Sequence, residues 1–249
     1  MISAVNTARR RGRYLSACAG KPFFGCVLPV HLALFGKTSG CFFAAPTLAV
    51  DANGGGVIAA GHANPEELAS FLGFLGKHRL LTDGPCPAGW RLNEPYYLYV
   101  LEPFAALPLG PAPAGLALNE AADAGRVADL LFAERPERRD SFYAELCTKR
   151  NHGMARVWAL ERDGEIVCTV GAYAVYGGEA YMACGETVEA LRGQGIGGWL
   201  ITKLADTLAA EGLRVTFLCR GERVRFYERL GFARAGSLGE YTDTKDEET

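Results

Sequence analysis

The sequence lacks the cysteine spacing that a metal site or a redox pair needs. No two of its eight cysteines are closer than eight residues, so there is no C-x-x-C pair and no zinc-ligand spacing. Several lie in apolar runs, where a thiol behaves as a small hydrophobic side chain. We therefore expect reduced thiols, a cytoplasmic protein and no metal cofactor.

A long hydrophobic run is also missing. The longest apolar stretch, Phe23–Phe35, contains Pro29 and is shorter than the roughly 17–25 residues needed to cross a bilayer. The arginines of residues 9–13 imitate the start of a signal peptide, but Lys21 and Pro22 separate them from the apolar stretch. An arginine-rich face of an exposed helix is the simpler interpretation, and we expect no membrane partner.

The chain has no surplus of charge of either sign. Lysine and arginine total 26 and aspartate and glutamate total 28, for a net charge of −2. Proteins dedicated to nucleic acid usually carry a basic surplus, so this class is not favoured. Residues 1–110 carry 9 basic and 6 acidic side chains (+3), which leaves 17 and 22 (−5) for residues 111–249. With 49% hydrophobic residues, the chain has enough apolar side chains for a core.

Two domains are predicted, with a boundary near residue 112. Residues 103–115 hold four prolines among small residues, which is typical of a semi-rigid connector; a surface loop inside one domain is the alternative. The expected domains are an accessory α/β domain at 1–112 and a second at 113–249. In the first we expect helices over 4–17 and from the N-cap at Asn64, and strands over 41–50, 56–61, 79–82 and 96–101.

The second domain shows a more regular pattern, in the order β-α-α-β-β-β-α-β-α-β. This order predicts a mixed, mostly antiparallel sheet flanked by helices, of the α/β (α+β) class. The expected strands are 115–118, 156–161, 165–176, 180–188, 214–219 and one from residue 232. The expected helices are 121–132, 137–149, 195–211 and 222–230.

A glycine-rich loop, residues 192–198, joins an expected strand to an expected helix. Glycines adopt positive φ and leave backbone N–H groups open to phosphate, and the following helix adds its positive end. Arg192 adds a fixed charge. The loop is neither a nucleotide P-loop, since no Gly-Lys-Ser/Thr follows, nor a dinucleotide site, since Val215-Thr216 stands where an acidic residue is expected.

Two motifs together resemble the GNAT superfamily of N-acetyltransferases. The family loop Gln/Arg-x-x-Gly-x-Gly/Ala is met by Arg192, Gly195 and Gly197, and the closing Tyr-x-x-x-Gly-Phe by Tyr227, Gly231 and Phe232. The resemblance covers about residues 114–240. It implies acetyl-coenzyme A as donor, with pantetheine lying between two strands that splay apart. Residues 1–110 do not repeat the Arg-x-x-Gly-x-Gly loop. Because some bacterial relatives pair a degenerate, cofactor-free GNAT-like domain with an active one, the N-terminal half is a candidate for such a degenerate domain.

The resemblance assigns roles to individual residues. The backbone around Thr187 and Val188 would bind pantetheine and polarise the thioester carbonyl. Pyrophosphate would be held by Arg192, Gly193, Gln194, Gly195, Gly197 and Gly198. Tyr227 would be the general acid for the leaving thiolate, with a packed helix tyrosine as the alternative. Glu186 would be the base, with a solvated strand carboxylate as the alternative. Cys184 is expected to be a packed thiol.

The resemblance thus implies an N-acetyltransferase that moves an acetyl group to a primary amine by direct attack in a ternary complex. The acceptor would be a small molecule or a protein amine, and the N-terminal domain would cover one side of the acceptor site or support a homodimer. The alternative is a non-catalytic coenzyme A sensor or interaction module. Small residues at 183–185 also permit a longer acyl group. Arg220 replaces a cofactor-binding asparagine of many relatives, and it would either lose that contact or meet a phosphate.

Overall fold

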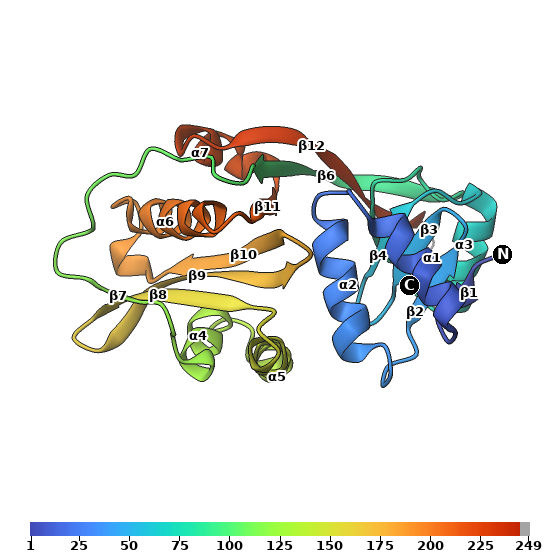
Figure 1. Ribbon diagram of the computed structural model, residues 1–249, viewed down its shortest axis with the longest axis horizontal. Coiled ribbons are helices and arrows are strands. Elements are labelled where there is room, and N and C mark those ends of the chain that lie inside the picture. Colours follow the sequence, from blue (N-terminus) through green and yellow to red (C-terminus); the bar gives the residue numbers. More distant parts are fainter. Residues whose placement is uncertain (245–249) are drawn as a thin grey trace. The chain divides into compact units, whose positions relative to one another are not determined.

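The computed structural model describes residues 1–244 and forms two compact units (Figure 1). The first unit contains residues 1–98, 218–224 and the described residues from Arg234 onward; the second contains 99–217 and 225–233. These limits differ from the predicted domains, 1–112 and 113–249. The difference arises because the last strand, β12 (Ala233–Asp243), pairs antiparallel with β5 (Arg79–Thr82) of the first unit.

The first unit contains three α-helices and most of the early strands among its described residues. Three expectations need correction. The first helix begins at Ala8 and not at residue 4, because Thr7 caps it by accepting from the N–H of Arg10. The apolar stretch from residue 24 to 35 is a helix, which was not predicted. The expected strand 41–50 is a two-stranded hairpin with its turn at residues 46–47. The elements are β1 (Ser3–Ala4), α1 (Ala8–Cys18), α2 (Phe24–Phe35), β2 (Phe42–Ala45), β3 (Leu48–Asp51), β4 (Val57–Gly61), α3 (Pro65–Phe74), β5 and β6 (Trp90–Leu101).

The second unit follows the predicted order of elements closely. The structure places strands at 165–176 and 214–219, the residues expected from the sequence. Its elements are β7 (Ala117–Asn119), α4 (Ala124–Leu131), α5 (Pro136–Asn151), β8 (Arg156–Arg162), β9 (Glu165–Tyr176), β10 (Glu179–Thr187), the 3-10 helix η1 (Glu189–Leu191), α6 (Ile196–Ala210), β11 (Arg214–Cys219), the 3-10 helix η2 (Gly221–Arg223) and α7 (Val224–Arg229).

The two units repeat one arrangement of elements. In the first unit the order is β1-α1-α2-β2-β3-β4-α3-β5, and in the second it is β7-α4-α5-β8-β9-β10-α6-β11. The pairing repeats as well. Three antiparallel pairs, β1–β2, β2–β3 and β3–β4, correspond to β7–β8, β8–β9 and β9–β10. The parallel pair β4–β5 likewise corresponds to β10–β11. The N-terminal unit is therefore a second copy of the same fold.

The core of the second unit lies on both faces of its central strand. Every residue from 166 to 174 of β9 is buried, as expected for a strand covered on both sides. Helix α6 covers one face and helices α4 and α5 cover the other (Figure 1). The α4–α5 face contains an apolar cluster that includes Val127, Leu146, Val157 and Tyr173. The two sides of β10 thus face different helices, and this separation positions the site.

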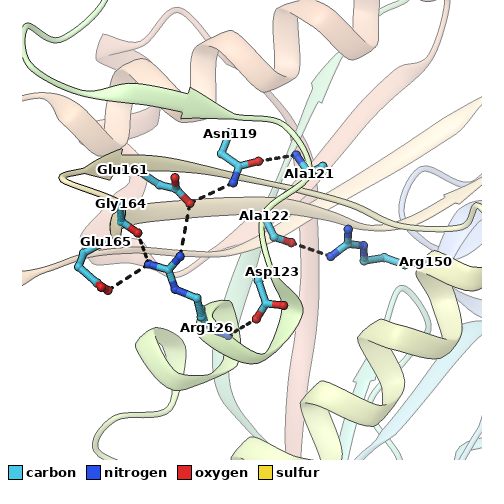
Figure 2. Close-up of polar contacts among 9 residues, drawn as sticks. All are labelled: Asn119, Ala121, Ala122, Asp123, Arg126, Arg150, Glu161, Gly164 and Glu165. Carbon is cyan, nitrogen blue, oxygen red and sulfur yellow. Dashed lines mark hydrogen bonds and ion pairs between the residues drawn. The ribbon is translucent and has the colours of Figure 1, made fainter.

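Polar contacts hold the start of α4 against the β8–β9 hairpin (Figure 2). Asp123 caps α4 by accepting from the N–H of Arg126 at 2.9 Å, and the Arg126 guanidinium donates to the carbonyl of Gly164 at 2.6 Å. Arg150 of α5 donates to the carbonyl of Ala122 at 2.7 Å. The other members of this network are Asn119, Ala121, Glu161 and Glu165. These contacts fix α4 and α5 relative to the sheet of their own unit.

Candidate functional site

Strand β10 separates from β11 before it ends. The two strands pair in parallel over three residue pairs, from Glu179–Arg214 to Tyr181–Thr216. Strand β10 nevertheless continues along β9 as far as Thr187. The segment 182–187 therefore leaves β11, and this is the divergence of strands that the resemblance implies for a pantetheine site.

The diverging segment is irregular at Cys184. The β9–β10 register shifts between Tyr181 and Met182 and again between Ala183 and Glu186. Cys184 lies inside the second bulge with a φ of 49°, a left-handed value that is uncommon for residues other than glycine. Sequence reasoning did not find this bulge, because a bulge depends on the register of the partner strand.

Charges from α5 and its N-terminal flank act on Cys184. Desolvation raises the pKa of its thiol, although part of the residue is open to solvent. Lys149, Arg138 and Arg135 act in the opposite direction, and Glu145 adds to the increase. Three cations and one carboxylate therefore act electrostatically on Cys184 of β10.

The glycine loop leads into a helix start that no side chain caps. Gly193 and Gly195 have φ of 78° and 77°, which glycine adopts without the strain that a Cβ brings. Gly195 is the N-cap of α6 and offers no capping side chain, so the first N–H groups of the helix have no side-chain acceptor. Arg192 and the loop residues through Gly195 are exposed. The arrangement suits an anion.

Two further glycines allow close packing at the start of α6. A Cβ on Gly198 would lie 3.0 Å from Leu230, which directly follows α7, and 3.8 Å from Phe226 of α7. A Cβ on Gly197 would lie 3.0 Å from the Oγ1 of Thr187, at the end of β10. Through these approaches the loop, the end of β10 and the tyrosine helix come together, so the two sequence motifs form one site.

Tyr227 lies half-buried on α7 among aromatic rings. Its ring centroid is 4.4 Å from that of Phe217, 5.0 Å from Phe226 and 5.9 Å from Tyr99. The packing expected of a helix tyrosine is thus present. It also fixes the ring on the helix that approaches the glycine loop, as a positioned general acid requires.

Glu186 and Arg192 form an ion pair beside the loop. The Nη2 of Arg192 is 3.1 Å from the Oε1 of Glu186, and its Nε donates to the carbonyl of Thr187 at 3.1 Å. The same Oε1 accepts from the N–H of Thr187 at 3.0 Å. Glu186 is therefore partnered and is not a solitary carboxylate on the strand.

The N–H groups of Thr187 and Val188 are engaged within the unit. Thr187 donates to Glu186, and Val188 donates to the carbonyl of Val167 on β9 at 2.9 Å. These are the two residues that the resemblance assigns to pantetheine. Their N–H groups would have to give up these partners before they could meet it.

Arg220 does not lie ready for a phosphate. It belongs to the first unit, where it binds the carboxylate of Glu94 and donates to Glu240 at 2.9 Å. Its guanidinium lies 4.6 Å from the ring centroid of Tyr96. The hydrogen bonds that Arg220 donates to Glu94 and Glu240 raise its pKa. The expectation that this arginine meets a cofactor phosphate is not supported, because two carboxylates already hold it.

Glu240 is the centre of that cluster. Burial by itself would raise the pKa of its carboxyl group, but hydrogen bonds from Arg79, Arg220 and Asn93 outweigh burial and leave the pKa lowered. The Nη2 of Arg79 is 2.8 Å from Oε1, and the amide of Asn93 is 3.1 Å from Oε2. The cluster joins strands β5, β6 and β12 of the first unit.

The counterpart helix of the first unit has a closed N-terminus. The side chain of Asn64 accepts from the N–H groups of Glu66 and Glu67 at 2.9 and 3.1 Å. Pro65 has no N–H, and the two glutamates place negative charge in the first turn. This helix start repels an anion, so of the two copies only the second has an open helix start of this kind.

Among residues 1–244 no group of three or more His, Cys, Asp or Glu side chains is placed to hold a metal ion. Over the same residues no helix is both long and apolar enough to span a membrane.

Residues 124–232 match the family model of the GNAT acetyltransferases. This part of the chain is therefore an acetyltransferase domain of the GNAT family. No curated protein matches the chain.

Solved structures share the fold over nearly the whole chain. A GCN5-related N-acetyltransferase from Kribbella flavida is 16% identical with a TM-score of 0.63, covering 88% of this chain and 94% of its own. A GCN5-related N-acetyltransferase from Sphaerobacter thermophilus is 14% identical with a TM-score of 0.63, covering 97% of this chain and 94% of its own. A tandem GNAT protein from the clavulanic acid biosynthesis pathway is 14% identical with a TM-score of 0.63, covering 97% of both chains. The last likeness agrees with the repeated arrangement of the two units.

Proposed function

We propose that the chain is an acetyl-CoA-dependent N-acetyltransferase that moves an acetyl group to a primary amine by direct attack in a ternary complex. The observation that carries the proposal is one juxtaposition in the second unit. The uncapped start of α6, the diverging end of β10 and the helix of Tyr227 meet at Gly197 and Gly198. Each is a part that coenzyme A binding and thioester chemistry require.

The residues present fit coenzyme A at its phosphate end. The N–H groups of the loop from Gly193 to Gly198 would hold pyrophosphate, with Arg192 beside them. Neither Gly193 nor Gly195 would bring a Cβ near other protein atoms, so the space around them is open. Pantetheine would follow the part of β10 that has left β11. When bound, acetyl-CoA supplies an activated acyl group as a thioester.

The reaction balances with one proton removed and one donated. The amine nitrogen forms a bond to the acyl carbon, the carbon–sulfur bond breaks, and the products are an amide and a thiol. Tyr227 would donate the proton that the leaving sulfur needs. Glu186 would accept the proton that the amine nitrogen loses, directly or through water.

Arg192 links cofactor binding to the base. It pairs with Glu186 at 3.1 Å, and it is also the cation assigned to pyrophosphate. Phosphate oxygens would compete with the carboxylate for the same guanidinium. An arginine that turns to the phosphate leaves Glu186 able to accept a proton.

The test is thiol release from acetyl-CoA in the presence of spermidine, tryptamine, L-lysine, kanamycin and a peptide with an unblocked N-terminus. We expect at least one amine to raise the rate and Tyr227→Phe to lower kcat about 10²-fold or more. Tyr176→Phe is the control, because Tyr176 lies 39% exposed at the far end of β9. Coenzyme A binding without transfer to any amine would instead support the alternative of a sensor or interaction module.

A cytoplasmic location is part of the proposal. All eight cysteines lie within the described residues and are thiols, not disulfides, as in a reducing compartment.

A further inference from the structure

A buried hydroxyl group without a hydrogen-bond partner lies on the α4–α5 side of β9. Tyr173 is 7% exposed, and its hydroxyl has no hydrogen-bond partner among the described residues. Its surroundings are apolar, with the ring of Phe142 at a centroid distance of 5.4 Å. Buried polar groups are nearly always paired because an unpaired one costs stability, so this exception requires an explanation.

The ring of Tyr173 lies across a glycine and ends beside the bulge of β10. A Cβ on Gly171 would lie 2.7 Å from the Cε2 and Cζ atoms of that ring, so the tip of the ring occupies the place of the missing side chain. Gly171 pairs with Ala183, and Ala183 packs against the same apolar cluster. The next residue is Cys184, and the pKa of Tyr173, raised chiefly by burial, is raised further by the electrostatic influence of Cys184. The phenol is therefore held next to the irregular segment.

The proposed function places pantetheine along that segment, so the acceptor amine has to come close to it. The part of β10 that has left β11 runs from residue 182 to 187 and contains the bulge. Helix α6 covers the opposite face of the sheet, whereas Tyr173 packs with the apolar cluster on the α4–α5 side, next to the bulge. Burial raises the pKa of Tyr173 well above its ordinary value, so the phenol is neutral at physiological pH. A neutral phenol oxygen can accept a hydrogen bond from an amine N–H and leave the nitrogen lone pair for attack.

We propose that Tyr173 is an acceptor-binding residue whose hydroxyl group, held over Gly171 beside the β10 bulge, takes the nucleophilic amine as its missing hydrogen-bond partner. The inference rests on the proposed function and deepens it, since it names a residue that orients the acceptor. It also explains why an unpaired hydroxyl is kept in an apolar site: the substrate pairs it.

The experiment combines stability with kinetics for Tyr173→Phe and the control Tyr176→Phe. Without ligand, removal of an unpaired buried hydroxyl leaves Tm unchanged or raises it by about 2–4 °C. The thiol-release assay then uses whichever of the amines named above gives the highest rate with the wild-type protein. For Tyr173→Phe, the KM for that amine should increase at least tenfold, while the KM for acetyl-CoA stays the same. Tyr176→Phe should change neither.

Gly171→Ala provides a second variant with a different signature. Its Cβ displaces the ring, so it should weaken amine binding as Tyr173→Phe does, but it should lower Tm because the ring loses its place.

Three results overturn the inference, and they are distinguishable. A fall in Tm for Tyr173→Phe shows that the hydroxyl is already paired inside the protein. An unchanged KM for the amine shows that the acceptor does not meet it, while the proposed function stands. No transfer to any amine by the wild-type protein overturns the proposed function and this inference with it.

Discussion

Replacing Gly195 with alanine distinguishes two effects of a glycine in the left-handed region. One is the backbone strain that another residue would bring there, and the other is the open space that the glycine leaves for a ligand. Gly195 has a φ of 77° at the start of α6, and a Cβ there meets no protein atom within 4 Å. Gly153, in the connection between α5 and β8, is a matched control: its φ is 67° and its Cβ also meets nothing within 4 Å. Both belong to the second unit. We therefore expect the two substitutions to have the same effect on the stability of the protein without ligand.

The expected loss of stability is the same at both positions. A left-handed residue other than glycine costs roughly 1–2 kcal/mol, and the reduced entropy of the unfolded chain offsets about 0.4–1 kcal/mol of that. The net loss of about 1 kcal/mol corresponds to a fall in Tm of about 2–4 °C for Gly195→Ala and Gly153→Ala alike.

The affinity for coenzyme A should differ between the two variants. The open space at Gly195 is where we place the pyrophosphate, so its Cβ displaces an oxygen from the loop N–H groups. A hydrogen bond to a charged group contributes about 1.5–3 kcal/mol, which is a roughly 10- to 100-fold increase in Kd. Isothermal titration with coenzyme A measures this. Equal affinities of Gly195→Ala and Gly153→Ala would refute the assignment of the loop.

Three further outcomes follow from the described contacts. Asp51→Ala should lower the free energy of unfolding by about 2–4 kcal/mol, because buried Asp51 accepts from His31 at 2.6 Å and from a backbone N–H; an unchanged denaturant midpoint would contradict this. Glu240→Gln should cost most stability at neutral pH. The lowered pKa of Glu240 stabilises the fold above the usual value of about 4.3, and that contribution disappears as the pH falls further, so the unfolding curves of wild type and variant should converge in acid. Arg138→Glu should shift the amine preference in the thiol-release assay toward spermidine and away from L-lysine, because it removes the excess of positive charge at Cys184; an unchanged ratio of kcat/KM values would contradict it.

Local rules predicted the elements that local residues determine. The N-terminus of α3 follows from Asn64 and Pro65, and the structure confirms both the cap and the proline at the first helical position. The left-handed glycines of the loop were expected at the strand-to-helix turn and are found there. Such features depend on a few neighbouring residues, so one sequence is enough to predict them.

Features that depend on a distant partner were missed. Strand β12 joins β5 of the first unit, a pairing between residues about 160 positions apart that no local pattern reveals. The hairpin at residues 46–47 lies inside one apolar run because both of its strands are buried. The bulge at Cys184 and the ring of Tyr173 over Gly171 depend on the β9–β10 register. The partners of Glu186 and Arg220 also come from folding and not from sequence spacing.

The number of coenzyme A molecules bound by each chain tests the central claim most directly. The fold occurs twice, but only the second copy has an uncapped helix start beside diverging strands, whereas Asn64 and two glutamates close the first. Native mass spectrometry of the full chain with excess coenzyme A should show one molecule per chain. At a coenzyme A concentration near the wild-type Kd, Gly195→Ala should lower the bound fraction in line with its roughly 10- to 100-fold higher Kd. Two molecules per chain, or one that survives Gly195→Ala unchanged, would contradict the account.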